Sequence, residues 1–247
     1  MHASEYERMD RLETSMWWYR GLHQLLAATV ARSVRPPAIQ ARRGLDAGCG
    51  TGGLLAVLAA QGGGIAWQGI EIDSQAAQRA QTKSGCAVAS ASIEAVPLND
   101  AAVDVAVSAD VLCHARVEPE LAVGELARVL APGGTLILNL PAYQWMLSRH
   151  DKAVHNTRRF SAGPVKALLA RHGFVAIRTT YWNTLLFPLM MLSRLLPGRG
   201  DAKSDVMEYP RWLDATFSGA LAVERLLLKL GVRLPFGGSL LVTAQKK

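Results

Sequence analysis

The sequence predicts an α/β fold in which helices cover both faces of a parallel sheet. Short apolar runs alternate with amphipathic stretches along most of the chain, and a glycine-rich turn, Gly48–Gly53, follows the first of these runs. Strand, helix and strand in succession build a parallel sheet. The chain has 247 residues, 50% hydrophobic and 19% charged, so it can bury a sizeable core and is not an intrinsically disordered chain.

The spacing of apolar residues places the individual elements. In the first 33 residues these positions recur at three- and four-residue steps, which predicts a helical region that ends before Pro36-Pro37. We expect strands at 45–47, 66–72, 87–91, 103–108, 135–140, 174–181 and 240–245. We expect helices at 53–61, 74–83, 119–130 and 161–172, with N-caps at Ser74 and Ser161 for the second and fourth.

Composition limits the function classes. The chain has three cysteines and no C-x-x-C pair, which indicates a reducing, cytoplasmic setting and no structural zinc. Its first residues are charged and contain no apolar core of a secretory signal. The net charge of +7 is spread along the chain, so it is as compatible with solubility alone as with an anionic partner.

The glycine-rich turn is the strongest functional signal. Gly48, Gly50 and Gly53 match a dinucleotide-binding pattern, in which glycines let the backbone approach a ligand at the start of a helix. Glu71 ends the second predicted strand, where both NAD enzymes and S-adenosylmethionine (SAM) enzymes place an acid for ribose hydroxyls. Asp46 separates the two, because a carboxylate beneath the turn favours a ligand with a cationic amino group over a pyrophosphate.

Five segments, in order, resemble the motifs of class I SAM-dependent methyltransferases of the type 11 kind. They are Asp46–Gly52, Gly69–Asp73, Glu94–Leu98, Val103–Ser108 and Leu126–Leu136, and the similarity covers roughly residues 43–183. The resemblance implies a Rossmann-like, doubly wound sheet of seven strands with the last strand antiparallel. We expect four parts: an N-terminal helical lid (1–35), a SAM-binding core (36–183), a helical insert (184–238) and the last core strand (239–247).

The same resemblance implies roles for individual residues in binding SAM. Glycines would pack against the methionine part, Asp46 would support their turn, Glu71 would bind ribose and Ile72 would flank adenine. Ser92, with Ile93 beside it, stands where the family often has an aspartate near the adenine. Asp110 would border the methionine end. The full expected set is Asp46, Gly48, Gly50, Gly52, Glu71, Ile72, Ser92, Ile93 and Asp110.

Methyl transfer from a sulfonium needs alignment and exclusion of water, and it needs a base only if the acceptor loses a proton. His114 follows the fourth strand, and His150 and His155 follow the fifth, so all three are candidate bases at the carboxyl edge of the sheet. Their spacing is poor for a metal, and we expect none. Candidate acceptor contacts are Trp17 and Tyr19 in the lid, Tyr143 and Arg158 after the fifth strand, and Trp182 and Phe187 near the insert.

The insert indicates the kind of acceptor. It contains an apolar run at 184–197, too short to span a bilayer, and a helix at 219–230 with a narrow polar stripe. We expect it to pack over the acceptor side as an apolar wall, which favours a small hydrophobic or amphiphilic acceptor. Peripheral contact with a membrane surface stays open.

Other functions stay open beside this one. An NAD(P)-dependent oxidoreductase is disfavoured by Asp46 and by the Ala131–Gly134 segment. A nucleic-acid methyltransferase is disfavoured because Asn139–Tyr143, which resembles an N-P-P-Y motif, follows the fifth strand rather than the fourth. A SAM-binding regulatory protein without activity remains an alternative, because cofactor binding does not imply transfer.

Overall fold

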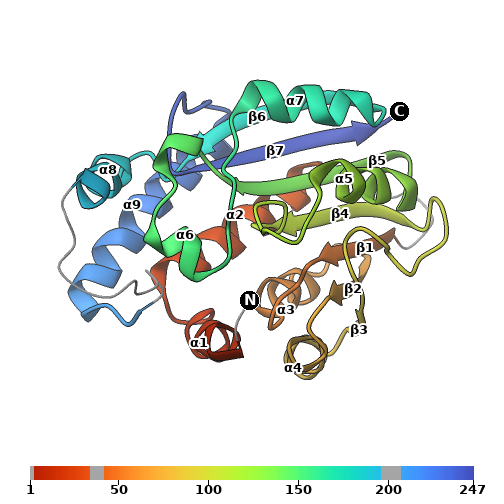
Figure 1. Cartoon of the computed structure of the whole chain (residues 1–247), viewed down its shortest axis with the longest axis horizontal. Coiled ribbons are helices and arrows are strands. Elements are labelled where there is room, and N and C mark those ends of the chain that lie inside the picture. The colour runs from red at the N-terminus through yellow and green to blue at the C-terminus, as the bar shows by residue number, and fades with distance from the viewer. Residues whose placement is uncertain (1–2, 34–41, 196–206) are drawn as a thin grey trace.

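A computed structural model of the chain describes residues 3–33, 42–195 and 207–247 (Figure 1). Its strands are β1 (Arg42–Ala47), β2 (Ile65–Glu71), β3 (Ala87–Ser90), β4 (Val103–Ala109), β5 (Leu130–Pro141), β6 (Phe174–Trp182) and β7 (Ser239–Lys246). Its first helices are α1 (Ala3–Leu12), α2 (Trp17–Ser33), α3 (Gly53–Ala60), α4 (Ser74–Ser84) and α5 (Pro119–Val129). A 3₁₀ turn (Gln144–Met146) and α6 (Arg149–Ala153), α7 (Ala162–Arg171), α8 (Phe187–Leu195) and α9 (Arg211–Lys229) follow.

The seven strands form one sheet in the order β3-β2-β1-β4-β5-β7-β6. Strands β1 to β5 pair in parallel, whereas β7 runs antiparallel to both β5 and β6. This confirms the predicted Rossmann-like, doubly wound fold with an antiparallel last strand. The strand order reverses between β1 and β4, and ligands of such sheets bind at the carboxyl ends of the strands beside that reversal.

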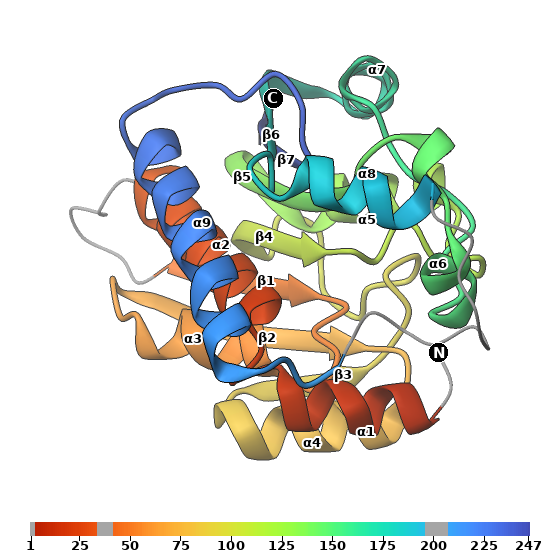
Figure 2. The ribbon, with the colours of Figure 1, turned by 90° about the vertical axis from the view of Figure 1, so that its left-hand side faces the viewer.

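Helices cover the two faces of the sheet with separate apolar cores. On one face α5 and α7 bury residues such as Leu126 and Leu169 against the strands. On the other face α2 and α3 pack with Leu25, Leu26 and Leu55, and α9 lies along α2 outside them (Figures 1 and 2). None of the described helices is both long enough and apolar enough to cross a bilayer.

Most predicted elements lie within a residue or two of the observed ones, and four predictions are wrong in detail. Strand β5 begins at Leu130, five residues before the predicted start. The N-terminal helical region is two helices, because the chain turns at residues 13–16. The N-cap of α4 is Asp73 rather than Ser74, since the Asp73 carboxylate accepts from the backbone N–H groups of Gln75 and Ala76. Helix α9 begins at Arg211, eight residues before the predicted start. The expected stop at Pro36-Pro37 lies outside the described residues.

The two N-terminal helices meet different partners. Helix α1 lies beside α4, where Asp10 pairs with Arg79 and Lys83 (Figure 2). Helix α2 packs against α3 and α9. The helices of the insert therefore do not stand alone, because α9 rests on the N-terminal region.

Candidate functional site

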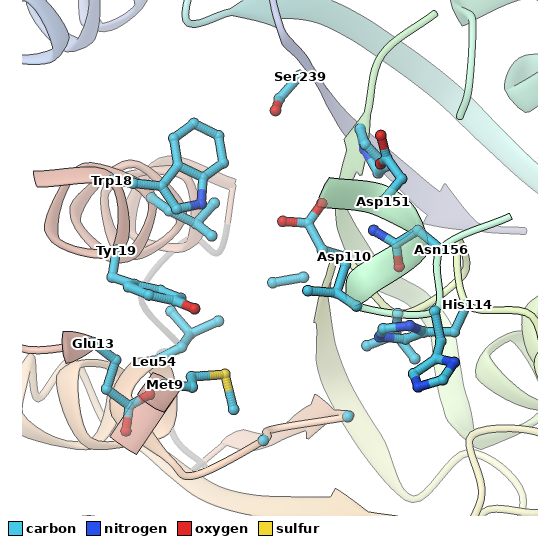
Figure 3. A pocket seen from close by; sticks show the side chains of 18 of the residues that line it. Met9, Glu13, Trp18, Tyr19, Leu54, Asp110, His114, Asp151, Asn156 and Ser239 are labelled. Carbon is cyan, nitrogen blue, oxygen red and sulfur yellow. The ribbon is translucent and has the colours of Figure 1, made fainter. Parts of the chain in front are cut away.

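A cavity of about 820 Å³ opens at the carboxyl ends of β1, β2, β4 and β5. Segments from every part of the chain line it: α1 and α2, the glycine-rich turn, the loops after β2 and β4, α6, and both helices of the insert. Figure 3 shows Trp18 and Tyr19 of α2 on one side, opposite Asp110, His114 and Asp151. The cavity is thus enclosed by the core on one side and by the terminal and inserted helices on the other.

The glycine turn forms because backbone bonds fix it to the end of β2. The N–H groups of Gly48 and Cys49 both donate to the carbonyl of Ile70, at 2.9 Å. Gly48 and Gly50 line the cavity with φ of 82° and 56°, values that favour glycine. Gly52 faces α4 instead, where a Cβ would lie 2.6 Å from the Cα of Ala80. Gly52 therefore allows the turn before α3 to pack closely against α4, and it does not line the cavity.

Glu71 is held rigidly at the end of β2. Its Oε2 accepts from the N–H of Gly50 at 3.0 Å, and its Oε1 accepts from the N–H of Asp73 at 3.1 Å. The hydroxyl of Tyr6 on α1 also donates to Oε1, at 2.8 Å. Burial, and after it the Glu71 charge, raises the pKa of Tyr6, so the phenol stays protonated as a donor. The carboxylate is oriented for further hydroxyl donors, and α1 reaches the same atom.

Asp46 carries the observation that tests the fit of SAM. Its side chain is buried beneath the turn and lines the cavity, and its Oδ2 has no hydrogen-bond partner among the described residues. Burial, followed by the charges of Glu71 and Glu13, raises the pKa of Asp46 to about 8. A buried carboxyl group that has no hydrogen-bond partner and lies near other acids would be stabilised in its ionised form by a nearby cation. The ammonium and sulfonium charges of SAM fit this need, whereas a pyrophosphate would add to the negative charge.

The remaining expected cofactor residues lie around the same cavity. Ile72 is 64% exposed at its rim, and Ser92 and Ile93 line it beyond β3. The Ser92 hydroxyl accepts from the N–H of Glu94 at 3.1 Å, so it is engaged in a local turn and its second lone pair stays available. Ile93 is buried.

Asp110 is held by an unusual local geometry. Its φ of 55° is left-handed, and its N–H donates to the carbonyl of Asn139 at 2.9 Å. The Nδ2 of Asn139 donates to both carboxylate oxygens, at 3.0 and 3.1 Å, while Trp182 Nε1 donates to Asn139 Oδ1 at 2.8 Å. The Trp182 donor thereby fixes which side of the Asn139 amide faces Asp110. A strained backbone held by neighbours in this way is typical of functional sites.

The surroundings of Asp110 also set its protonation. Removal from bulk water raises its pKa to about 7, although Asn139 and Arg159 act in the opposite direction. Because a carboxyl group with such a pKa exchanges its proton near neutrality, it can act as an acid or a base. Trp18 stacks on Trp182 with ring centroids 4.8 Å apart, which connects α2 to this chain of contacts.

The three predicted histidines are placed differently. His114 is half-buried in the cavity lining, and burial lowers its pKa to about 4. His155 also lines the cavity, but it is exposed, with φ of 61°. The side chain of His150, on α6, lies outside the described residues. Two of the three candidate bases therefore reach the cavity, and His114 is neutral at pH 7.

A buried ion pair lies behind these histidines. Arg159 donates from Nε to both oxygens of Asp151 at 3.1 Å and from Nη2 at 2.9 Å, and both residues line the cavity. Burial acts to raise the pKa of Asp151, but Arg159 and Ser148 outweigh it and the pKa is lowered. Arg158, the basic residue singled out from sequence, donates to the Val117 carbonyl and does not line the cavity.

The aromatic residues expected to contact the acceptor divide into two groups. Trp17 and Tyr19 line the cavity, and Trp17 packs edge-on against Phe217 of α9, with ring centroids 5.0 Å apart. Trp182 is buried as the partner of Asn139 and Trp18. Tyr143 and Phe187 pack on each other, with Phe187 buried, outside the cavity lining. Trp182, Tyr143 and Phe187 therefore make structural contacts. Of the expected aromatic residues, Trp17 and Tyr19 line the cavity.

Sequence reasoning missed several residues of the site. Glu13 is buried at the end of α1 and accepts from the Thr51 hydroxyl and the Gly53 N–H, at 2.8 and 3.1 Å, so it caps α3. Tyr6, Met9 and Glu13 fall at helical spacing, and an acid on the apolar side of an amphipathic helix was the available signal. The insert also contributes large side chains to the cavity lining, namely Leu186, Leu189, Met190, Tyr209, Leu213 and Phe217.

Comparison with known proteins identifies the core. Residues 45–138 match the family described as methyltransferase domain. A probable S-adenosylmethionine-dependent methyltransferase of Mycobacterium tuberculosis (strain H37Rv) is 30% identical over 171 residues, 67% of this chain and 58% of the relative. A 24-methylenesterol C-methyltransferase 2 of Oryza sativa subsp. japonica is 34% identical over 146 residues, 51% of this chain and 38% of the relative. The chain spans less than two thirds of the length of these relatives.

Solved structures share the whole fold at low sequence identity. A SAM-dependent methyltransferase of Thermotoga maritima, described as a possible histamine N-methyltransferase, superposes with a TM-score of 0.61 at 22% identity, over 99% of this chain and 96% of that one. Geranyl diphosphate C-methyltransferase of Streptomyces coelicolor A3(2) gives 0.61 at 14% identity, over 90% and 75%. The glycine turn and Glu71 lie within the matched segment, and residues 45–138 carry a SAM-dependent methyltransferase domain of the type 11 kind.

Proposed function

We propose that this chain transfers a methyl group from SAM to a small acceptor that is mainly apolar and carries one polar group. The observation that carries the proposal is the cavity itself. Its lining includes Gly48, Gly50 and Glu71 of the core, and the residues that the insert adds are mainly apolar. The lining also includes polar groups, Asp110 and His114 among them.

In this proposal the core residues hold the cofactor. Glu71, fixed by the Gly50 and Asp73 N–H groups, accepts hydrogen bonds from ribose hydroxyls. Ile72 and Ile93 flank the adenine, and Asp46 balances the cationic end. SAM supplies a methyl group on a sulfonium, already activated for in-line displacement. The protein therefore contributes alignment and exclusion of water, which can account for about 7–11 kcal/mol of a barrier.

The terminal and inserted helices form the acceptor side. Helices α1 and α2 act as the lid, and helices α8 and α9 of the insert act as the acceptor wall. Trp17 and Tyr19 from the lid, with Leu213 and Phe217 from α9, present aromatic and apolar faces to the cavity. The named acceptor of one relative, 24-methylenesterol, is of this apolar kind. An acceptor of the same general character, though not necessarily a sterol, fits the wall.

Asp110 is the base that this arrangement favours for an acceptor with a proton to lose. Its pKa of about 7 is closer to neutrality than the pKa of about 4 of His114, so the Asp110 carboxylate binds a proton more strongly at neutral pH. His114, and His155 at the cavity rim, then orient the polar group of the acceptor. The Asp151–Arg159 pair supplies a fixed dipole at the same end of the cavity.

The test uses SAM with a labelled methyl group and an extract fractionated into apolar metabolites, polar metabolites and nucleic acid. We expect calorimetry to show binding of S-adenosylhomocysteine but not of NADH, and label to enter the apolar fraction. Label in the nucleic-acid fraction would show that the acceptor is a nucleic acid and not a small apolar molecule. Binding without transfer to any fraction would indicate the regulatory alternative, and binding of NADH in place of SAM would contradict the proposal altogether.

A further inference from the structure

Helix α9 presents an apolar stripe to solvent. Trp212, Gly219, Val223, Leu226 and Leu230 recur at steps of seven, four, three and four residues, which places them on one side of a helix. Trp212, Leu226 and Leu230 are 70%, 56% and 71% exposed. The opposite side, with Leu221, Glu224 and Leu228, is buried against the body of the protein. The stripe therefore faces away from α2, which lies behind α9 in Figure 2.

The charges of α9 are sorted between these two sides. Its two acids point inward, since Asp214 pairs with Arg20 and accepts from the Trp17 N–H at 2.8 Å. The other acid, Glu224, is buried and accepts from the Leu185 N–H at 2.7 Å. The basic residues of this helix and of the turn after it are Arg211, Arg225, Lys229 and Arg233. Arg225 is half-buried, the other three are exposed, and none of the four pairs with a carboxylate within the described residues. Glu208, just before the helix, is exposed, and the outer side of α9 itself is apolar and basic.

Apolar residues of both helices of the insert line the cavity. Leu189 of α8 is 52% exposed and also lines the cavity, and Leu185, joined to α9 through Glu224, is exposed to the same degree. Leu213 of α9 follows Trp212 of the stripe directly and lines the cavity.

We infer that the outer side of α9 is a docking surface for an anionic lipid bilayer. An apolar stripe flanked by Lys and Arg is the pattern of helices that lie in a membrane interface. A second copy of the chain fits less well, because a two-fold contact through this surface would bring the same basic side chains together. Binding to lipid does not depend on methyl transfer; only the delivery of an acceptor from the bilayer rests on the proposed function.

The experiment measures co-sedimentation of the purified chain with vesicles, either phosphatidylcholine alone or a mixture containing phosphatidylglycerol. We expect binding to the anionic vesicles that weakens with salt. Leu226→Gln with Leu230→Gln should reduce the binding at least about tenfold, since both leucyl side chains lose apolar contact. Lys229→Gln and Arg233→Gln should each reduce it about fivefold. Leu121→Gln on α5, also an exposed leucine at 59%, is the matched control and should bind as the original chain does.

The outcomes separate the alternatives. Absence of binding to anionic vesicles, or equal binding by the Leu226/Leu230 variant and the control, would overturn the inference. A dimer in solution that the Leu226/Leu230 variant abolishes would assign the surface to a second copy instead. Calorimetry with S-adenosylhomocysteine on the same variants should be unchanged, which shows that they remain folded and keeps a failure of lipid binding distinct from a failure of the proposed function.

Discussion

Substitution of Asp46 by Asn should remove a pH dependence from the stability of the protein. Asp46 is buried beneath the glycine turn with an unpaired Oδ2, and its pKa is raised from 3.8 to about 8, first by burial and then by Glu71 and Glu13. The folded chain therefore keeps this proton over a range in which the unfolded chain has lost it. Stability is highest near the unfolded pKa and falls as pH rises towards 8.

The size of the effect follows from the shift. About four pKa units correspond to about 6 kcal/mol at full effect. Water that reaches the carboxyl group through the cavity makes this effect smaller. We expect the free energy of unfolding to fall by at least about 2 kcal/mol between pH 5 and pH 8.5. Asn has the shape of the protonated acid and does not titrate. The Asp46→Asn variant should therefore become progressively more stable than the original chain as pH rises.

The assay is urea unfolding followed by circular dichroism at several pH values, without SAM. Asp100→Asn, which changes an exposed carboxylate, is the control and should leave the slope between pH 5 and 8.5 unchanged. Addition of SAM should favour the ionised form of Asp46, so the original chain should release protons on binding and the Asp46→Asn variant should bind SAM more weakly. An equal loss of stability with pH in both proteins would refute the reasoning, because the carboxyl group would then not be held neutral.

Three further substitutions test other parts of the site. Glu71→Gln should weaken the binding of SAM by about 1.5–3 kcal/mol in calorimetry, since charge-assisted hydrogen bonds are lost. An unchanged affinity would show that Glu71 does not bind the ribose. Leu213→Ala should raise the KM for an apolar acceptor at constant SAM affinity, whereas Leu192→Ala, exposed on α8 outside the cavity lining, should not. Trp182→Phe keeps a ring against Trp18 but removes the donor to Asn139. It should lower kcat and move the acidic limb of the pH–rate profile, and an unmoved limb would separate Asp110 from proton transfer.

The part of the site made by neighbouring residues could be predicted from sequence. The turn from β1 to α3 needs glycines at fixed positions, and Glu71 ends β2 beside it, so both follow from local spacing. The seven-stranded sheet with an antiparallel last strand came from the family resemblance and agrees with the structure. Element ends were less certain: the cap of α4 moved by one residue to Asp73 because an extended backbone there lets the carboxylate reach two N–H groups.

The rest depends on contacts between distant segments. Asp110, Asn139 and Trp182 lie on three different strands or loops, 29 and 43 residues apart, and no spacing indicates that they bond. Trp182 is aromatic and close to the insert in the sequence, which predicted a contact with the acceptor. In the structure its indole N–H donates to the buried Asn139 amide instead. The break between α1 and α2 escaped notice for a similar reason. Apolar spacing runs through it, and the turn exists because Glu13 bonds to Thr51 and Gly53.

Helices α2 and α9 are joined by close packing and by hydrogen bonds along their length. Gly21 of α2 lies so close to α9 that a Cβ would be 2.3 Å from Leu221, and Arg32 donates to the Leu228 carbonyl at 2.7 Å. Trp17 bonds through its N–H to Asp214, which itself lies on α9. Trp18 of α2 stacks on Trp182, which donates to the Asn139 amide that orients Asp110, so a continuous series of contacts joins α9 to the polar end of the cavity.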